Sequence, residues 1–156
     1  MKKYIILALI IITMMGAFSC AFDYQDTPYP HFKTPKDALQ WVSRNIKYVG
    51  DPVAHNSLEY WQGPLETIQR GTGDCEDYAI LAGWLLLKNF NINTSIIIAQ
   101  NVDKQGHAML LYDNKWLSPQ AYGLIENPQA WTVIDTITIQ QALAWANILY
   151  GSRGLK

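Results

Sequence analysis

Two stretches of the chain, residues 35–49 and 138–151, carry apolar residues at steps of three and four. Thr34 and Pro35 are suited to the N-cap and the first position of a helix, and Gly50 is suited to its end. Both stretches predict amphipathic helices that bury one face. Their apolar positions are Ala38, Leu39, Trp41, Val42, Ile46 and Val49 in the first, and Ala142, Leu143, Trp145, Ala146 and Leu149 in the second.

A third helical stretch, which begins near Cys75, is apolar on every side. No charged residue occurs from Tyr78 to Leu87, so the predicted helix must be buried in the middle of the domain. Asp74 stands at the N-cap, and Asp77 stands where a capping box places its second acceptor.

The rest of the folded part predicts loops, a short helix and strands. Residues 51–63 predict a loop, and residues 64–70 predict a short helix that opens on a proline and closes before a glycine. Three segments separated by turn sequences predict antiparallel strands: residues 92–100, 107–113 and 115–118. The fold class that follows is α+β, with helices packed on one side of a small antiparallel sheet.

The N-terminus has the layout of an export signal. Two lysines precede an apolar stretch over residues 4–15, and small residues follow before Cys20. The stretch is short for a spanning helix, which needs roughly 20 apolar residues, so cleavage is favoured. The sequence AFSC, which ends at Cys20, resembles a bacterial lipobox, in which the cysteine is acylated and becomes the mature N-terminus.

These features predict a lipoprotein-type signal peptide over residues 1–19, a tether over residues 20–33 and one folded domain over residues 34–156. Acylation of Cys20 would anchor the domain to a membrane of the cell envelope, facing the periplasm or the exterior. Plain secretion and an uncleaved anchor stay open as alternatives.

The composition fits one ordinary globular domain. Hydrophobic residues make up 49% of the chain and aromatic residues 12%, which is enough for a core and argues against disorder. The net charge is −1, and no run of lysine and arginine follows the leader, so we expect no nucleic-acid partner. We expect a monomer.

The chain has two cysteines, Cys20 and Cys75. A disulfide is their ordinary use in an exported protein, but a lipid on Cys20 would leave Cys75 as a lone thiol and a candidate nucleophile. At a helix start, free N–H groups and the helix dipole favour a thiolate. The carboxylates of Asp74, Glu76 and Asp77 oppose it unless they point away, so the thiolate also needs a cationic partner such as histidine.

Of the three histidines, His107 is the candidate partner. It directly follows Gly106 at the start of a predicted strand, and the residues after it are apolar. His31 and His55 lie in predicted loops near prolines, where we expect them to be solvated.

Two motifs contain the candidate pair. The first, YWQGPLETIQRGTGDCEDYA over residues 60–79, ends in Gly-Asp-Cys-x-Asp-x-Ala, and the second, GHAMLLYDNKW over residues 106–116, opens on Gly-His-Ala. In order and spacing they resemble the transglutaminase-like, papain-related cysteine hydrolase superfamily, and the chain looks like a small bacterial member. The resemblance implies that Cys75 attacks an amide or related acyl carbon and that His107 takes its proton.

The resemblance also implies further site residues. Trp61 or Gln62 would donate a hydrogen bond to the tetrahedral oxyanion, although Trp61 reads equally well as a core aromatic residue. The family usually places an Asp after the histidine strand to orient the imidazole. Here Ser118 stands at that position with Gln120 nearby, and Asp113 is a poorly aimed substitute at a hairpin corner.

Two functions are therefore open. The first is an exported, membrane-tethered cysteine hydrolase or acyl transferase that acts on a peptide or protein substrate through a thioester, by hydrolysis or by transamidation. The second is an inactive domain of the same kind that serves as a binding module at the cell envelope. No metal and no cofactor are expected, because one lone cysteine and scattered histidines lack the spacing of a Cys/His metal site.

Overall fold

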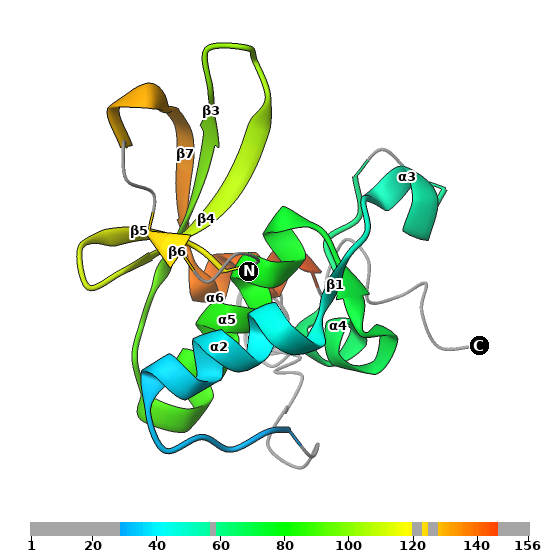
Figure 1. Cartoon of the computed structure of the whole chain (residues 1–156), viewed down its shortest axis with the longest axis vertical. Helices are drawn as coiled ribbons and strands as arrows, with labels where there is room; N and C mark the ends of the chain where they lie inside the picture. The colour runs from blue at the N-terminus through cyan, green and yellow to red at the C-terminus, as the bar shows by residue number, and fades with distance from the viewer. Residues whose placement is uncertain (1–28, 57–58, 120–122, 125–127, 147–156) are drawn as a thin grey trace, which may run out of the picture.

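The computed structural model describes residues 29–56, 59–119, 123–124 and 128–146 (Figure 1). Helices gather on one side of a five-stranded sheet, which confirms the predicted α+β class. The predicted signal peptide, Cys20 and Gln120 lie outside the described residues. The elements are α2 (Pro35–Asn45), β1 (Lys47–Tyr48), α3 (Asp51–Ala54), α4 (Pro64–Arg70), β2 (Thr72–Gly73), α5 (Cys75–Phe90), β3 (Ser95–Gln100), β4 (Gly106–Tyr112), β5 (Lys115–Ser118), β6 (Gly123–Leu124), a 3-10 turn (Pro128–Ala130), β7 (Thr132–Thr138) and α6 (Ile139–Trp145).

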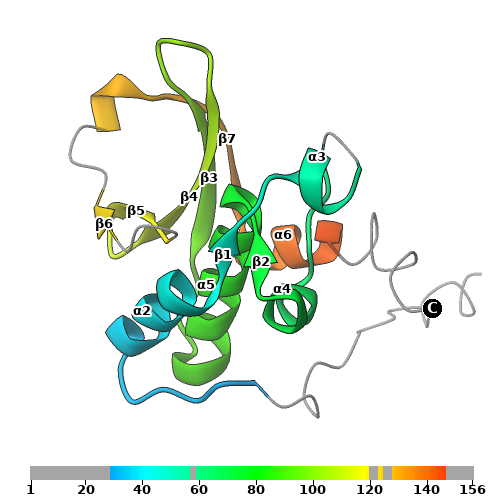
Figure 2. The same cartoon turned by 45° about the vertical axis from the view of Figure 1, so that its right-hand side comes forward.

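Helix α2 follows its predicted pattern but ends earlier than Gly50, at Asn45. Thr34 and Asp37 cap its start reciprocally, each side chain accepting the other's backbone N–H at 3.2 and 3.1 Å. The chain then becomes extended and forms β1, which pairs in parallel with β2 (Figure 2). The sequence analysis did not predict these two strands, because each has only two residues.

Helix α5 is the central buried helix that the sequence predicts. Every residue from Glu76 to Leu86 is buried, and α2 packs against it. At its start the N–H of Asp74 donates to Asp77 Oδ2 at 3.2 Å. A Cβ on Gly73 would lie 2.7 Å from the Cβ of Asp77, so this close approach requires the glycine that precedes the Asp-Cys pair.

The sheet has the strand order β6-β5-β4-β3-β7, and all of its neighbours pair antiparallel. Helix α5 packs on one face through a cluster that includes Ile96 and Ala108, and the other face carries a smaller cluster around Ile97 and Met109. Strand β7 was not predicted. Six of its seven residues are exposed, so only Ile137 gives the apolar signal of a buried strand face.

Residues 29–33, which belong to the predicted tether, pack against α5. The ring of Tyr29 meets that of Trp84 edge-on with centroids 5.0 Å apart. The N–H of Phe32 donates to Asn89 Oδ1 at 3.0 Å. Within the part of the chain that the structure describes, no helix has both the length and the apolar composition of a membrane span.

Two predictions for residues 51–63 were wrong. The stretch is not all loop, because it begins with the single turn of α3. His55 is not solvated: it is half-buried and stacks on Tyr60 with ring centroids 4.0 Å apart. Burial lowers the pKa of His55. His31 is exposed, as expected.

Candidate active site

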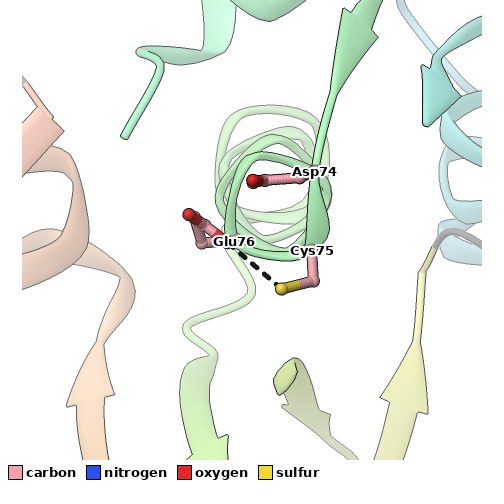
Figure 3. A group of neighbouring side chains, drawn as sticks. All are labelled: Asp74, Cys75 and Glu76. Carbon is pink, nitrogen blue, oxygen red and sulfur yellow. Dashed lines mark hydrogen bonds between the residues drawn. The ribbon is translucent and has the colours of Figure 1, made fainter. Parts of the chain in front are cut away.

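Cys75 is a half-buried free thiol at the first residue of α5. Its Sγ donates a hydrogen bond to Glu76 Oε2 at 3.1 Å (Figure 3). Cys75 also packs against the cluster that includes Ala108, on β4, and the backbone N–H of Ala108 is close enough to act on the pKa of the thiol. The sulfur therefore lies where the start of α5 meets the start of β4.

The surroundings of Cys75 favour the neutral thiol, so the expected thiolate is not stabilised in this structure. Burial, followed by the charge of Glu76, raises the pKa of Cys75 well above its usual value. The Ala108 N–H lowers this pKa but does not offset the other effects. The condition that the neighbouring carboxylates point away is not met, because Glu76 turns toward the sulfur.

His107 lies near the start of β4 and contacts Ser118 at the end of β5. The distance from His107 Nε2 to Ser118 Oγ is 3.3 Å, and Ser118 is buried. The ring of Trp131 lies against the imidazole with centroids 5.6 Å apart. Burial lowers the pKa of His107, so the imidazole is neutral near pH 7. The structure thus places Ser118 in contact with the imidazole. A catalytic role for Ser118 stays a prediction.

Asp113 does not take the place of an orienting carboxylate. It is exposed, follows the far end of β4, about 20 Å along the strand from His107, and pairs with Lys115 at 3.6 Å.

The sulfur reaches the backbone beside His107 but not its ring. Side chains of a strand alternate between faces, and on β4 Ala108 packs toward α5 whereas Met109 packs with Trp131 on the opposite face. His107 shares the face of Met109. Among the described residues, no hydrogen bond joins Cys75 Sγ to the imidazole of His107.

Trp61 is partly exposed, whereas its neighbour Gln62 is buried. Trp61 is half-buried and packs against the same cluster as Cys75. Its ring lies tilted against that of Trp145 with centroids 5.6 Å apart, and its indole N–H donates to Glu59 Oε2 at 3.3 Å. Gln62 is fully buried, and its backbone N–H donates to Asp77 Oδ1 at 2.7 Å. Both polar atoms of its carboxamide are buried without a hydrogen-bond partner among the described residues.

Five carboxyl groups gather at the start of α5. The oxygens of Asp51, Glu59 and Glu76 lie within 4.8 Å of one another, and so do those of Asp51, Asp74 and Asp77. Burial raises the pKa of Asp51 to about 6, of Asp77 to about 8 and of Glu76 to about 9. We name these five residues the acidic cluster.

The acidic cluster has little positive charge to balance it. Among the described residues, no Lys or Arg forms an ion pair with Asp51, Asp74, Glu76 or Asp77. One buried oxygen of Asp51 and one of Asp74, each an Oδ1, have no hydrogen-bond partner there. Carboxylate oxygens in this arrangement suit a hard cation such as Ca²⁺.

Sequence reasoning missed this cluster because it looked for Cys/His spacing. Asp51 and Glu59 lie outside the Gly-Asp-Cys motif, and Asp51 turns inward to accept the N–H of Tyr60. Trp131 was missed too, because it precedes a strand that the sequence analysis did not predict.

Comparison with known proteins gives a family and a fold. A family model described as "Transglutaminase-like domain" matches residues 27–113, which is more than half of the chain and includes Cys75 and His107. No curated protein matches the chain.

Among solved structures, the chain is similar to LapG of Legionella pneumophila. The EGTA-treated form has a TM-score of 0.52 and 21% identity, and the match covers 66% of this chain and 61% of that one. The calcium-bound form has a TM-score of 0.52 and 24% identity, and the match covers 69% of this chain and 67% of that one. The chain therefore spans less than two thirds of the EGTA-treated LapG chain, and the likeness concerns the fold.

Proposed function

The chain belongs to the transglutaminase-like domain family, and we propose that it is a cysteine hydrolase or acyl transferase with Cys75 as nucleophile and His107 as base. One observation carries the proposal: Cys75 packs against the cluster that includes Ala108, the residue that follows His107, and the N–H of Ala108 lowers the pKa of the thiol. The two candidate groups, 32 positions apart in the chain, thus come to one end of β4.

The proposed chemistry assigns one role to each ring nitrogen. In this mechanism the imidazole carries its proton on Nε2, which lies 3.3 Å from Ser118 Oγ, and the lone pair of Nδ1 accepts the thiol proton. The Sγ–C bond then forms at the acyl carbon, and the leaving amine departs with a proton from the imidazolium. Water or an amine next attacks the thioester, which gives hydrolysis or transamidation.

We interpret the structure as a resting state in this proposal. The thiol of Cys75 keeps its proton and donates it as a hydrogen bond to Glu76, and the imidazole lies against Ser118 and Trp131. Because the imidazole shares the face of β4 that points away from α5, turnover requires it to move to the side of the sulfur. This is a larger change than the tightening of a long hydrogen bond when substrate binds.

Release of p-nitrophenolate from p-nitrophenyl acetate tests the proposal without knowledge of the natural substrate. We expect Cys75→Ala to abolish the fast phase of release and His107→Ala to slow it by roughly 100-fold or more. A wild-type chain that reacts no faster than Cys75→Ala would favour the inactive binding module instead.

The acidic cluster supports a second proposal, that the chain binds a divalent cation. One of the similar structures is of calcium-bound LapG, and Ca²⁺ takes six to eight oxygen ligands. The ion would be held by Asp51 together with Glu59 and Glu76, or with Asp74 and Asp77, the two groups whose oxygens lie within 4.8 Å of one another. The ion would supply positive charge beside the thiol of Cys75, whose pKa is raised by burial first and then by the charge of Glu76.

Proton release on cation binding tests this second proposal independently of activity. Asp77 and Glu76, with pKa values raised to about 8 and 9, would have to lose protons to bind Ca²⁺ near pH 7. Calorimetry in buffers of different ionisation enthalpy should therefore show a heat that depends on the buffer. Asp51→Asn should weaken binding, and the distant Asp113→Asn should not. The absence of binding heat in the wild-type chain would contradict the site.

We further propose that acylated Cys20 tethers the domain to a membrane. Eight residues separate Cys20 from Tyr29, the first described residue, and a chain of that length spans at most about 30 Å. The domain would then work close to the lipid surface. Metabolic labelling with palmitate should mark the wild-type chain and not Cys20→Ala, and an unlabelled wild-type chain would contradict the tether.

A further inference from the structure

Tyr48 lies beside the start of α5 although it belongs to neither motif. Strands β1 and β2 lie side by side (Figure 2). In their parallel register Tyr48 is opposite Gly73, two residues before Cys75. The pairing is fixed on both sides of Tyr48. The N–H of Lys47 donates to Gly71 O at 2.8 Å, and the N–H of Val49 donates to Gly73 O at 3.0 Å.

The ring of Tyr48 is held at the cysteine end of the helix. It lies against the ring of Tyr78, with centroids 6.5 Å apart, and Tyr78 follows Cys75 by one turn on the same side of α5. Tyr78 is itself fixed, because its hydroxyl donates to the carbonyl of Ile46. Tyr48 remains 54% exposed, so an acyl group arriving from solvent can meet it.

The hydroxyl of Tyr48 has no hydrogen-bond partner among the described residues. The charges that act on it are those of Cys75, Asp74, Glu76 and Asp51, so it faces the same end of α5 as the thiol. Desolvation and these charges raise the pKa of Tyr48 to about 12, so the phenol keeps its proton at neutral pH.

We propose that Tyr48 donates a hydrogen bond to the oxyanion that forms when Cys75 attacks an acyl carbon. The inference rests on the proposed function and names a donor for it. The backbone N–H of Cys75, in the first helical turn, can supply one donor. Of the other candidates, the indole N–H of Trp61 is bonded to Glu59 and the carboxamide of Gln62 is fully buried, whereas Tyr48 is exposed.

The phenol of Tyr48 keeps its proton throughout this step and only donates a hydrogen bond. As the Sγ–C bond forms, the π electrons of the carbonyl move onto its oxygen, which accepts the Tyr48 O–H as a hydrogen bond. When the leaving group departs, the carbonyl re-forms and that hydrogen bond weakens. The stabilisation is therefore greatest near the tetrahedral intermediate.

Two reactions of the same sulfur test the inference in the full chain with Ca²⁺ present. Acylation by p-nitrophenyl acetate passes through an oxyanion, and alkylation by iodoacetamide at a saturated carbon does not. We expect Tyr48→Phe to slow acylation by roughly 10- to 100-fold and to leave alkylation within about twofold of the wild type. Tyr112→Phe, at the far end of β4, should change neither rate.

Each other outcome overturns the inference. If Tyr48→Phe leaves acylation unchanged while Cys75→Ala abolishes it, the proposed function stands and Tyr48 is not the donor. If acylation and alkylation fall together, Tyr48 supports the fold or the thiol rather than the oxyanion. If the wild type acylates no faster than Cys75→Ala, the proposed function fails and the inference fails with it.

Discussion

The helix side and the strand side of the candidate site differ in charge. Around Cys75, at the start of α5, five carboxyl groups gather. Around His107, on β4, the neighbours are the hydroxyl of Ser118 and the ring of Trp131. Yet both sides favour the neutral form of their reactive group, because the pKa of Cys75 is raised and that of His107 is lowered.

The neutral forms of Cys75 and His107 are therefore favoured for different physical reasons. Glu76 and burial hold the proton on Cys75, whereas burial alone keeps His107 neutral. An ion pair of thiolate and imidazolium would need positive charge on the helix side and negative charge on the strand side. Substitutions that alter one side at a time can therefore separate the effects that keep Cys75 protonated from those that keep His107 neutral.

The largest expected effect is on stability, from loss of the carboxyl group that organises the helix side. Asp77 accepts the backbone N–H groups of Asp74 and Gln62 and is fully buried. Asp77→Ala should leave both donors unsatisfied, at a cost of roughly 3 kcal/mol and about 10 °C in Tm. Asp77→Asn, which keeps one acceptor oxygen, should lose less. Equal Tm values for Asp77→Ala and wild type in thermal unfolding would contradict the role of this carboxyl group.

The next prediction concerns the pH dependence of stability. Burial raises the folded-state pKa of Asp51, Asp77 and Glu76 to about 6, 8 and 9, above unfolded values near about 4. The folded state thus binds more protons, so this contribution is fully present below about pH 4 and is lost as pH rises through these values. Without Ca²⁺, Tm should fall by about 5 °C or more between pH 5 and pH 9. A Tm that rises over this range would show that the cluster is ionised in the folded chain.

The Glu76→Gln variant tests the helix side through the reactivity of the Cys75 thiol. In the wild type, Glu76 ionises near pH 9 and its charge then opposes the thiolate of Cys75. The rates of iodoacetamide alkylation should therefore diverge above pH 9, with Glu76→Gln faster by about tenfold. Glu66→Gln is the matched control, because Glu66 pairs with Arg70 at the surface. Identical pH–rate profiles for Glu76→Gln and wild type would show that Glu76 does not affect the ionisation of Cys75.

Ser118→Asp tests the strand side, with the smallest expected effect. A carboxylate beside Nε2 should raise the pKa of His107 by about one unit and increase acylation severalfold. Ser118→Asn, of similar volume and without charge, should leave this pKa near that of the wild type. NMR titration of the His107 ring measures it. A pKa that does not move in Ser118→Asp would show that position 118 does not act on the imidazole.

The helix side could be predicted from the sequence because its contacts are local. Gly73, Asp74 and Asp77 lie within one turn of Cys75, and their capping contacts appear as a motif. The central helix was predictable as well, since it lacks charge from Tyr78 to Leu87.

The remainder depends on contacts between distant segments. Asp51 and Glu59 join the acidic cluster only through the folded path of residues 51–63. Trp131 reaches His107 from the turn before β7, a strand too exposed to be recognised. The face of the sheet on which the His107 imidazole lies depends on its exact position in β4. Sequence spacing does not fix that position to within one residue, and a shift of one residue would place the side chain on the other face.

The most direct test of the central claim is the site of acetylation after brief exposure of the full chain to p-nitrophenyl acetate, located by peptide mass mapping. We expect one acetyl group on Cys75, formed more slowly in His107→Ala and absent in Cys75→Ala. Acetylation confined to lysines, or an equal rate on Cys75 with and without the imidazole, would contradict it.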